Sequence, residues 1–228
     1  MRRRFFAARI GLAGLALLCA RVAPGGELRT ISVVTPGTPA RWSAASGGLM
    51  QLFDPFGDED KALQLKRIAR EDRWDLAKRV QQQLLEALAK HERIALPLVI
   101  SRPPELSPRA LARDRLPATA LPGTLLDVSV EWFGLYRPGA FDAYKPMVSV
   151  SYRLVDAHGS LAYSSRWIYY NVAPGNRPKG GESVDADAEC TWQSFEQLPK
   201  ERVRLWGCMD VVLEKIADRV AARVAPSQ

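Results

Sequence analysis

The sequence predicts a single α+β domain, in which a mixed or antiparallel sheet with a three-strand meander is packed by two long helices. Two segments, 58–92 and 199–224, carry apolar residues at helical spacing. Three others, 124–132, 147–155 and 161–171, alternate apolar and polar residues as half-buried strands do. A chain of 228 residues is long enough to bury one sizeable core.

Two further strands are expected before the meander. Residues 28–36 are rich in β-branched side chains and end in a Pro-Gly pair, which predicts a first strand. Residues 94–101 predict a second strand, in which Pro97 indicates either the edge of the sheet or the first turn of the strand. Residues 37–57 and 103–122 are expected to be irregular connections.

Both predicted helices are amphipathic. The segment 58–92 begins with three acids, which suit the positive end of a helix dipole, and continues with apolar residues four apart. This pattern predicts one long helix, or a helix broken near Asp72. The helix at 199–224 is expected to bury a stripe made of Leu205, Met209, Val212, Leu213, Ile216 and Val220.

The meander is expected to have one face on the core and one facing water. In its first strand the apolar face consists of Leu126, Val128, Val130 and Trp132, and the opposite face of Leu125, Asp127, Ser129 and Glu131. A turn at 156–159 contains a glycine, which adopts positive φ without strain. Residues 172–190 predict a long loop insertion rich in Gly, Pro and charge.

The first 25 residues have the layout of a bacterial export signal: a basic head, a short apolar run and small residues. The run at 10–18 is shorter than the about 20 residues that a membrane span needs. Either Cys19 becomes a lipid acceptor, or cleavage at a nearby small residue frees a soluble form. The domain at 26–228 is therefore expected in the periplasm or on the periplasmic face of the outer membrane, with membrane contact only through the signal or a lipid anchor.

The charge balance argues against nucleic-acid binding. The chain has 32 basic and 25 acidic residues, but five of the arginines and none of the acids lie in residues 1–25. The remaining charges nearly cancel, and the basic clusters are interleaved with acids. A protein that depends on phosphate-backbone contacts needs a concentrated basic surface.

Removal or lipidation of Cys19 leaves an even pair of cysteines, Cys190 and Cys208. Outside the cytoplasm such a pair is expected to form a disulfide. The alternative is two independent thiols, with Cys208 packed on the buried side of the last helix.

Motifs for catalysis and cofactor binding are missing. The two histidines, His91 and His158, have no cysteine or carboxylate at metal-ligand spacing, which argues against zinc. The chain contains neither a G-x-S-x-G nucleophile motif nor a phosphate-binding loop. We therefore expect no catalytic residues, no metal and no cofactor, although two carboxylates brought together by the fold would permit glycan hydrolysis.

Two groups of apolar side chains are candidates for contact with a partner, with burial in the core as the alternative for each. One lies in the last strand of the meander and the other in the small-residue segment 44–53. The candidate residues are Trp167, Tyr169, Tyr170, Leu49, Met50 and Phe53.

The hairpin at 150–161 resembles an element of the small αβ sandwich in several bacterial envelope proteins: a strand, Leu154-x-Asp156, a turn at Gly159 and a second strand. These are the amino-terminal domain of the Tol-Pal propeller protein, the curli secretion lipoprotein, penicillin-binding-protein activator lipoproteins and auxiliary lipoproteins of ABC transporters. The resemblance implies a binding or assembly role without catalysis.

Together these observations predict a non-catalytic, exported cell-envelope protein that acts as an adaptor or auxiliary in assembly or transport and binds another envelope protein. The alternative is a periplasmic module for small ligands or glycans, followed by a carboxylate-dependent hydrolase. Convergent carboxylates in a pocket would favour the alternatives, whereas a flat face with an exposed apolar patch would favour the adaptor. The sequence leaves the oligomeric state open.

Overall fold

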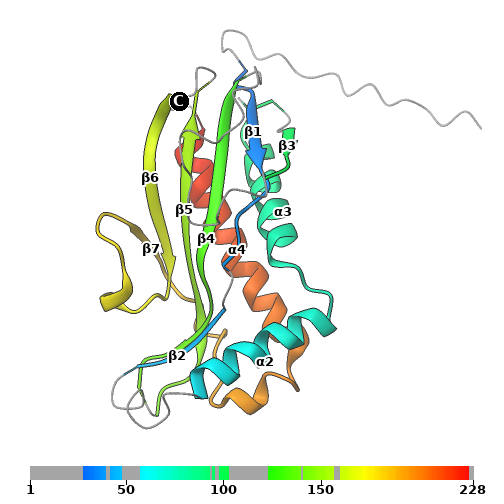
Figure 1. Cartoon of the computed structure of the whole chain (residues 1–228), viewed down its shortest axis with the longest axis vertical. Coiled ribbons are helices and arrows are strands. Elements are labelled where there is room, and N and C mark those ends of the chain that lie inside the picture. The colour runs from blue at the N-terminus through cyan, green and yellow to red at the C-terminus, as the bar shows by residue number, and fades with distance from the viewer. Residues whose placement is uncertain are drawn as a thin grey trace, which may run out of the picture.

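The strands of the protein form one mixed sheet, whose long strands run along the vertical axis of Figure 1. The computed structural model describes residues 28–39, 42–47, 57–92, 94–95, 98–102, 123–139, 141–156 and 160–225, with the side chains of 163–165 left out. Within them, the seven strands are β1 (Ile31–Val34), β2 (Ser43–Ser46), β3 (Leu98–Ile100), β4 (Thr124–Arg137), β5 (Lys145–Val155), β6 (Leu161–Tyr170) and β7 (Glu182–Val184).

The sheet has the order β3-β1-β4-β5-β6-β7, and β2 pairs with the far end of β4. The long strands β4, β5 and β6 form the predicted antiparallel meander. All pairs outside the meander are parallel, so the sheet is mixed. The strand predicted within 94–101 is present as β3 at the edge of the sheet, as expected, whereas Pro97 itself lies outside the described residues.

In the described part of the chain three helices pack on the sheet, not the two long ones that the sequence predicted: α2 (Gly57–Glu71), α3 (Leu76–Ala89) and α4 (Arg202–Val224). The segment 58–92 is broken just after Asp72, where Arg73 has φ of +55°. Asp75 then caps α3 by accepting a hydrogen bond from the Lys78 amide at 3.1 Å. At the break the Trp74 side chain is buried in the core. Of the two predicted arrangements, one long helix or a helix broken near Asp72, this core contact favours the broken one.

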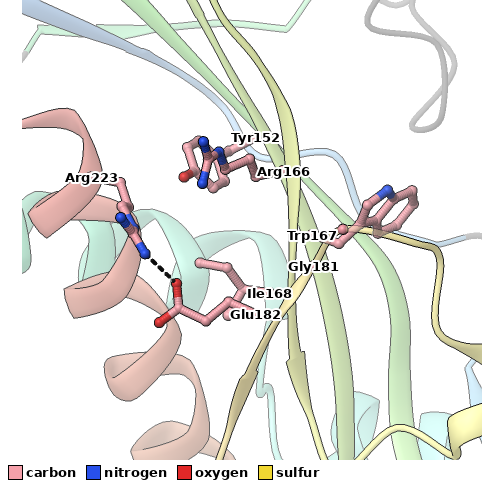
Figure 2. A pocket seen from close by; sticks show the side chains of 8 residues that line it. Tyr152, Arg166, Trp167, Ile168, Gly181, Glu182 and Arg223 are labelled. Carbon is pink, nitrogen blue, oxygen red and sulfur yellow. Dashed lines mark hydrogen bonds and ion pairs between the residues drawn. The ribbon is translucent and has the colours of Figure 1, made fainter.

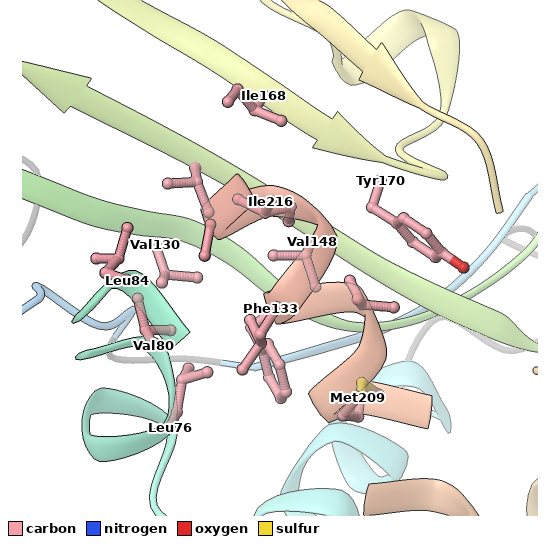
Figure 3. Packing of buried hydrophobic residues seen from close by; sticks show 14 of the residues in the cluster. Leu76, Val80, Leu84, Val130, Phe133, Val148, Ile168, Tyr170, Met209 and Ile216 are labelled. Atoms are coloured by element: carbon pink, nitrogen blue, oxygen red, sulfur yellow. The ribbon is translucent and has the colours of Figure 1, made fainter. Parts of the chain in front are cut away.

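The main core lies between the helices and one face of the meander. Figure 3 shows Val80 and Leu84 of α3 and Ile216 of α4 packed in one layer with Val130 and Val148 of the sheet. The whole stripe expected on the last helix is buried, which confirms that prediction. Helices α3 and α4 also pack against each other, and α2 contacts β2 at the other end of the molecule (Figure 1).

A β-bulge in β4 corrects the predicted face of Trp132. The pairing with β5 shifts between Val130 and Trp132, so the alternation reverses there. Phe133 instead of Trp132 follows Val130 into the helix-side core, and Trp132 lies on the opposite face. A one-residue shift of this kind moves every later side chain to the other face of the sheet.

Strand β2 lies in the segment 37–57, which was expected to be irregular. It pairs in parallel with the last residues of β4, and that strand extends to Arg137 instead of ending at 132. Gly134 makes this close approach possible: a Cβ atom there would lie 1.7 Å from the Ser43 carbonyl oxygen, and its φ is +152°.

The expectation that the second face of the meander faces water is wrong at its centre. Asp127 and Ser129 of β4 are completely buried. Arg102 covers Asp127 and donates hydrogen bonds to the Thr35 and Val128 carbonyl oxygens at 2.9 and 3.1 Å. Alternation reports the two faces of a strand, but it carries no information on what a distant segment places over the polar one.

The segment 172–190, expected as a loop, contains a short 3-10 helix at Pro174–Asn176 and the edge strand β7. Strand β7 extends the sheet beyond β6 in parallel. Val184 of β7 packs into the main core, and Glu182 forms ion pairs with Arg219 and Arg223 of α4. Contacts with a helix far along the chain therefore hold the strand in place.

Candidate functional site

Four of the residues proposed from sequence lie outside the described part of the chain. They are Cys19, the candidate lipid acceptor, and Leu49, Met50 and Phe53, the apolar residues of the segment 44–53. The described start of that segment, Ala44 to Ser46, belongs to β2 and is largely buried.

Cys190 and Cys208 form the expected disulfide, with their Cα atoms 5.7 Å apart. The bridge joins the segment after β7 to the first half of α4, and both residues belong to the main core. The structure therefore has the expected bond and not the alternative of two independent thiols. A disulfide is compatible with a location outside the cytoplasm.

Two of the three proposed aromatic contacts of β6 lie inside the protein. Tyr170 is fully buried, where its hydroxyl donates a hydrogen bond to the Asp187 carboxylate at 3.2 Å and accepts one from the Asp187 amide at 2.6 Å. Burial raises the pKa of Tyr170 to about 12. Tyr169 is also buried, and its hydroxyl donates to the Pro178 carbonyl oxygen at 2.7 Å. Their rings are therefore not available at the surface.

The sheet face opposite the helices carries a second group of aromatic residues. Trp132, Tyr136 and Trp167 are partly exposed there and pack around Tyr169 and other buried side chains. We refer to these three residues as the aromatic face. The Trp167 ring lies parallel to that of Tyr169, with centroids 6.5 Å apart. Sequence reasoning found only Trp167, because the bulge that brings Trp132 to this face left no signal in the alternation.

A buried ion pair lies on the same side of the sheet. The Arg102 guanidinium donates a hydrogen bond to one oxygen of the Asp127 carboxylate, whose other oxygen has no hydrogen-bond partner within the described structure. Burial raises the pKa of Asp127 to about 6, although Arg102 and Arg153 act in the opposite direction. Sequence reasoning placed Asp127 on a solvated face and missed this pair.

The shifted pKa of Asp127 makes stability depend on pH. The folded protein binds the Asp127 proton more tightly than the unfolded chain does, so this contribution is present below about pH 4 and lost as the pH rises through 6. Relative to Asp127→Asn, the wild type should lose about 2–3 kcal/mol of unfolding free energy between pH 4 and pH 7. Urea denaturation across that range measures the difference.

An exposed acid provides the control for this measurement. Asp185→Asn, between β7 and the disulfide, should leave the pH profile of the wild type unchanged. If Asp127→Asn and the wild type showed parallel profiles, Asp127 would not titrate in this range.

A small cavity opens between β6, β7 and the end of α4, with a volume of about 230 Å³. Its polar wall is formed by Arg166 of β6, Glu182 of β7 and Arg223 of α4 (Figure 2). The Arg223 guanidinium binds Glu182 at 3.1 Å, and Arg219 binds the other oxygen of the same carboxylate at 3.4 Å. The ring of Tyr152, the cross-strand neighbour of Arg166, lines the inner side.

Acidic side chains do not converge on this cavity. Glu182 is the one acid among the described residues that line it. Likewise, no group of three or more metal-ligating residues occurs in the part of the chain that the structure describes. Acids elsewhere in the structure have structural partners: Asp58 accepts two hydrogen bonds from Ser46, and Asp187 binds Lys215 and Tyr170.

Comparison with known proteins identifies no family for this chain. No protein-family model matches it, and no curated protein is significantly similar to it. The crystal structure of a Xanthomonas campestris protein described as family DUF330 is similar over 87% of this chain and 86% of that chain, with a TM-score of 0.42 and 10% sequence identity. A similarity this weak establishes neither a shared family nor a shared function. Among the described helices, none has the length and apolarity of a membrane span.

Proposed function

We propose that the protein is exported to the bacterial cell envelope and acts there as an adaptor or auxiliary that binds another envelope component, without catalysing a reaction. The observation that carries the proposal is the Cys190–Cys208 disulfide. Such bonds persist in oxidising compartments and are rare in the cytosol. The basic head and short apolar run of residues 1–25 supply the matching export signal.

The aromatic face supports a binding role. Trp132, Tyr136 and Trp167 come from two neighbouring strands and lie on the side of the sheet that the helices leave uncovered. Partly exposed tryptophan and tyrosine side chains are enriched where proteins bind one another. An exposed apolar patch on a sheet face was the feature expected for an adaptor, whereas convergent carboxylates in a pocket were expected for a ligand-binding module or a hydrolase. The aromatic face therefore supports the adaptor.

A module for a small ligand is the second candidate, because the cavity between β6, β7 and α4 favours it. Its lining has two arginines and a single carboxylate, whereas hydrolysis of a glycosidic bond requires a pair of carboxyl groups. The cavity therefore supports binding of a ligand and gives no support to the carboxylate-dependent hydrolase.

Site-specific photo-crosslinking in intact cells tests the adaptor proposal. A benzophenone amino acid at position 167, on the aromatic face, should give one discrete crosslinked species in the envelope fraction. The matched control carries the same group at position 203, where Val203 of α4 is 90% exposed and belongs to the helical side of the molecule. This control should give no such species.

Two results would contradict the proposal. One is recovery of the chain from the cytosol with Met1 still attached, which would remove the export step. The other is crosslinking at position 203 equal to that at position 167, or crosslinking at neither, which would remove the aromatic face as a contact.

A further inference from the structure

We infer that the cavity between β6, β7 and α4 binds a phosphate group, either of a small phosphomonoester or of a lipid headgroup. The inference does not depend on the adaptor role, because the charged residues that would hold the ligand, Arg166, Glu182 and Arg223, do not belong to the aromatic face, although Trp167 of that face also lines the cavity. Figure 2 shows Arg166, Glu182 and Arg223 on one side of the strand and the Trp167 side chain directed to the other.

The charge of the cavity is the first argument. Glu182 shares its two carboxylate oxygens between Arg219 and Arg223. Arg166, on the neighbouring wall, has no ion-pair or hydrogen-bond partner within the described residues. The charged groups that line the cavity, Arg166, Glu182 and Arg223, carry a net charge of +1, and Arg219 adds a further positive charge beside Glu182. The site therefore favours an anion.

The available hydrogen-bond donors are the second argument. A guanidinium has five N–H donors in a planar fork, a geometry suited to phosphate oxygens. Arg223 uses one terminal nitrogen on Glu182, and Arg166 keeps its whole fork for a ligand. Arg166 stands opposite Tyr152 in the strand register, and the ring of Tyr152 is fully buried at the inner side of the cavity.

The size and shape of the cavity are the third argument. Its volume of about 230 Å³ is below the roughly 300–1,000 Å³ of sites for drug-sized molecules. The rim at Gly180 and Gly181 carries no side chains, and open space surrounds the position where a Cβ of Gly180 would lie. The cavity therefore admits a phosphate with a few attached atoms and leaves room at the rim for the rest of a larger molecule.

Thermal unfolding of the purified full-length protein with increasing inorganic phosphate, at constant ionic strength set by chloride, tests the inference. Saturable stabilisation by phosphate is expected for the wild type, because a ligand that binds the folded state raises the melting temperature. Arg166→Gln should weaken the apparent Kd for phosphate by about tenfold or more, since it removes charge-assisted hydrogen bonds. The apparent Kd of Arg166→Lys for phosphate should lie between those of the wild type and Arg166→Gln.

Arg67→Gln provides the matched control. Arg67 is an exposed arginine of α2, on a helix that does not line the cavity, and its substitution removes the same charge. This variant should bind phosphate within about twofold of the wild type, since it leaves the cavity unchanged. The inference is overturned if phosphate stabilises the wild type no more than chloride does, or if Arg166→Gln and Arg67→Gln behave alike.

Two further probes distinguish the sources of the phosphate. Glycerol 3-phosphate that binds more tightly than inorganic phosphate indicates a soluble phosphomonoester. Binding to phosphatidylglycerol vesicles but not to phosphatidylcholine vesicles, with displacement by free phosphate, indicates a lipid headgroup. In both cases Arg166→Gln should weaken the binding by about tenfold or more, and an affinity equal to that of the wild type in this variant contradicts the site.

Discussion

Replacement of Trp74 by alanine is expected to lower the free energy of unfolding by about 4 kcal/mol, as large-to-small changes of buried aromatic residues do. Trp74 is nearly buried at the break between α2 and α3. Its ring stacks between Trp206 of α4, at 4.7 Å, and Phe133 of β4, at 5.4 Å. The Trp74 ring thus connects the junction of α2 and α3 with α4 and with β4 of the sheet. Its removal would leave a cavity between Trp206 and Phe133.

The hydrogen bond of the indole adds to this cost. The Trp74 Nε1 group donates to the Asp210 carboxylate at 3.2 Å, and burial raises the pKa of that carboxyl. Without the indole, the half-buried carboxylate loses a donor and keeps only the more distant Arg79, at 3.7 Å. Urea denaturation followed by circular dichroism measures the loss.

Two variants separate these contributions. Trp74→Phe keeps an aromatic ring in the stack but removes the N–H donor, so it should cost about half as much as the alanine variant. Phe141→Ala removes an aromatic ring that is fully exposed, and it should change stability by less than about 0.5 kcal/mol. A loss below 1 kcal/mol in Trp74→Ala would show that the stack does not hold the helices to the sheet.

Loss of the Cys190–Cys208 disulfide is expected to cost about 3 kcal/mol, because the bond closes a loop and restricts the unfolded chain. The two residues are separated by 18 positions. The double variant Cys190→Ala/Cys208→Ala is the suitable form, since both side chains are buried and alanine introduces no polar atom there.

Reductant provides the control for this result. Dithiothreitol should destabilise the wild type by an amount close to that of the double variant, and it should leave the double variant unchanged. Thiol titration of unreduced, denatured protein should find neither Cys190 nor Cys208 reactive. Two reactive thiols from these positions would remove both the bond and the main support for an oxidising compartment.

Local patterns in the sequence were sufficient for the meander and for α4. The six residues of the predicted α4 stripe recur at helical spacing, and all of them are buried in the core. The alternation in β5 likewise places Val148, Val150 and Leu154 toward the helices. Periodicity works here because burial of one face is the dominant stabilising term for such elements.

Elements that depend on distant contacts were missed. Strand β2 has only four residues, all of them small, and its backbone can approach β4 because that strand has Gly134 there. Strand β7 depends on the ion pairs of Glu182 with α4. Neither segment has a β-branched or alternating pattern strong enough to indicate a strand by itself.

The candidate sites divide in the same way. The disulfide followed from the number of cysteines and the export signal, which are both properties of the sequence. The cavity could not be predicted from the sequence, because Arg166, Glu182 and Arg223 come from three separate elements and each resembles an ordinary surface charge. Tyr169 and Tyr170 were proposed as surface contacts, yet β7 and the segment around it bury them.

The sequence by itself determined the α+β class, the meander, the last helix and the cysteine pairing, since each is encoded in local spacing or in residue counts. Only the tertiary structure decided the break between α2 and α3, the bulge that moves Trp132 to the aromatic face, the buried Asp127–Arg102 pair and the arginine-lined cavity. The physical reason is that these features arise from packing between segments distant in the chain, and the free energy of such packing outweighs local preference.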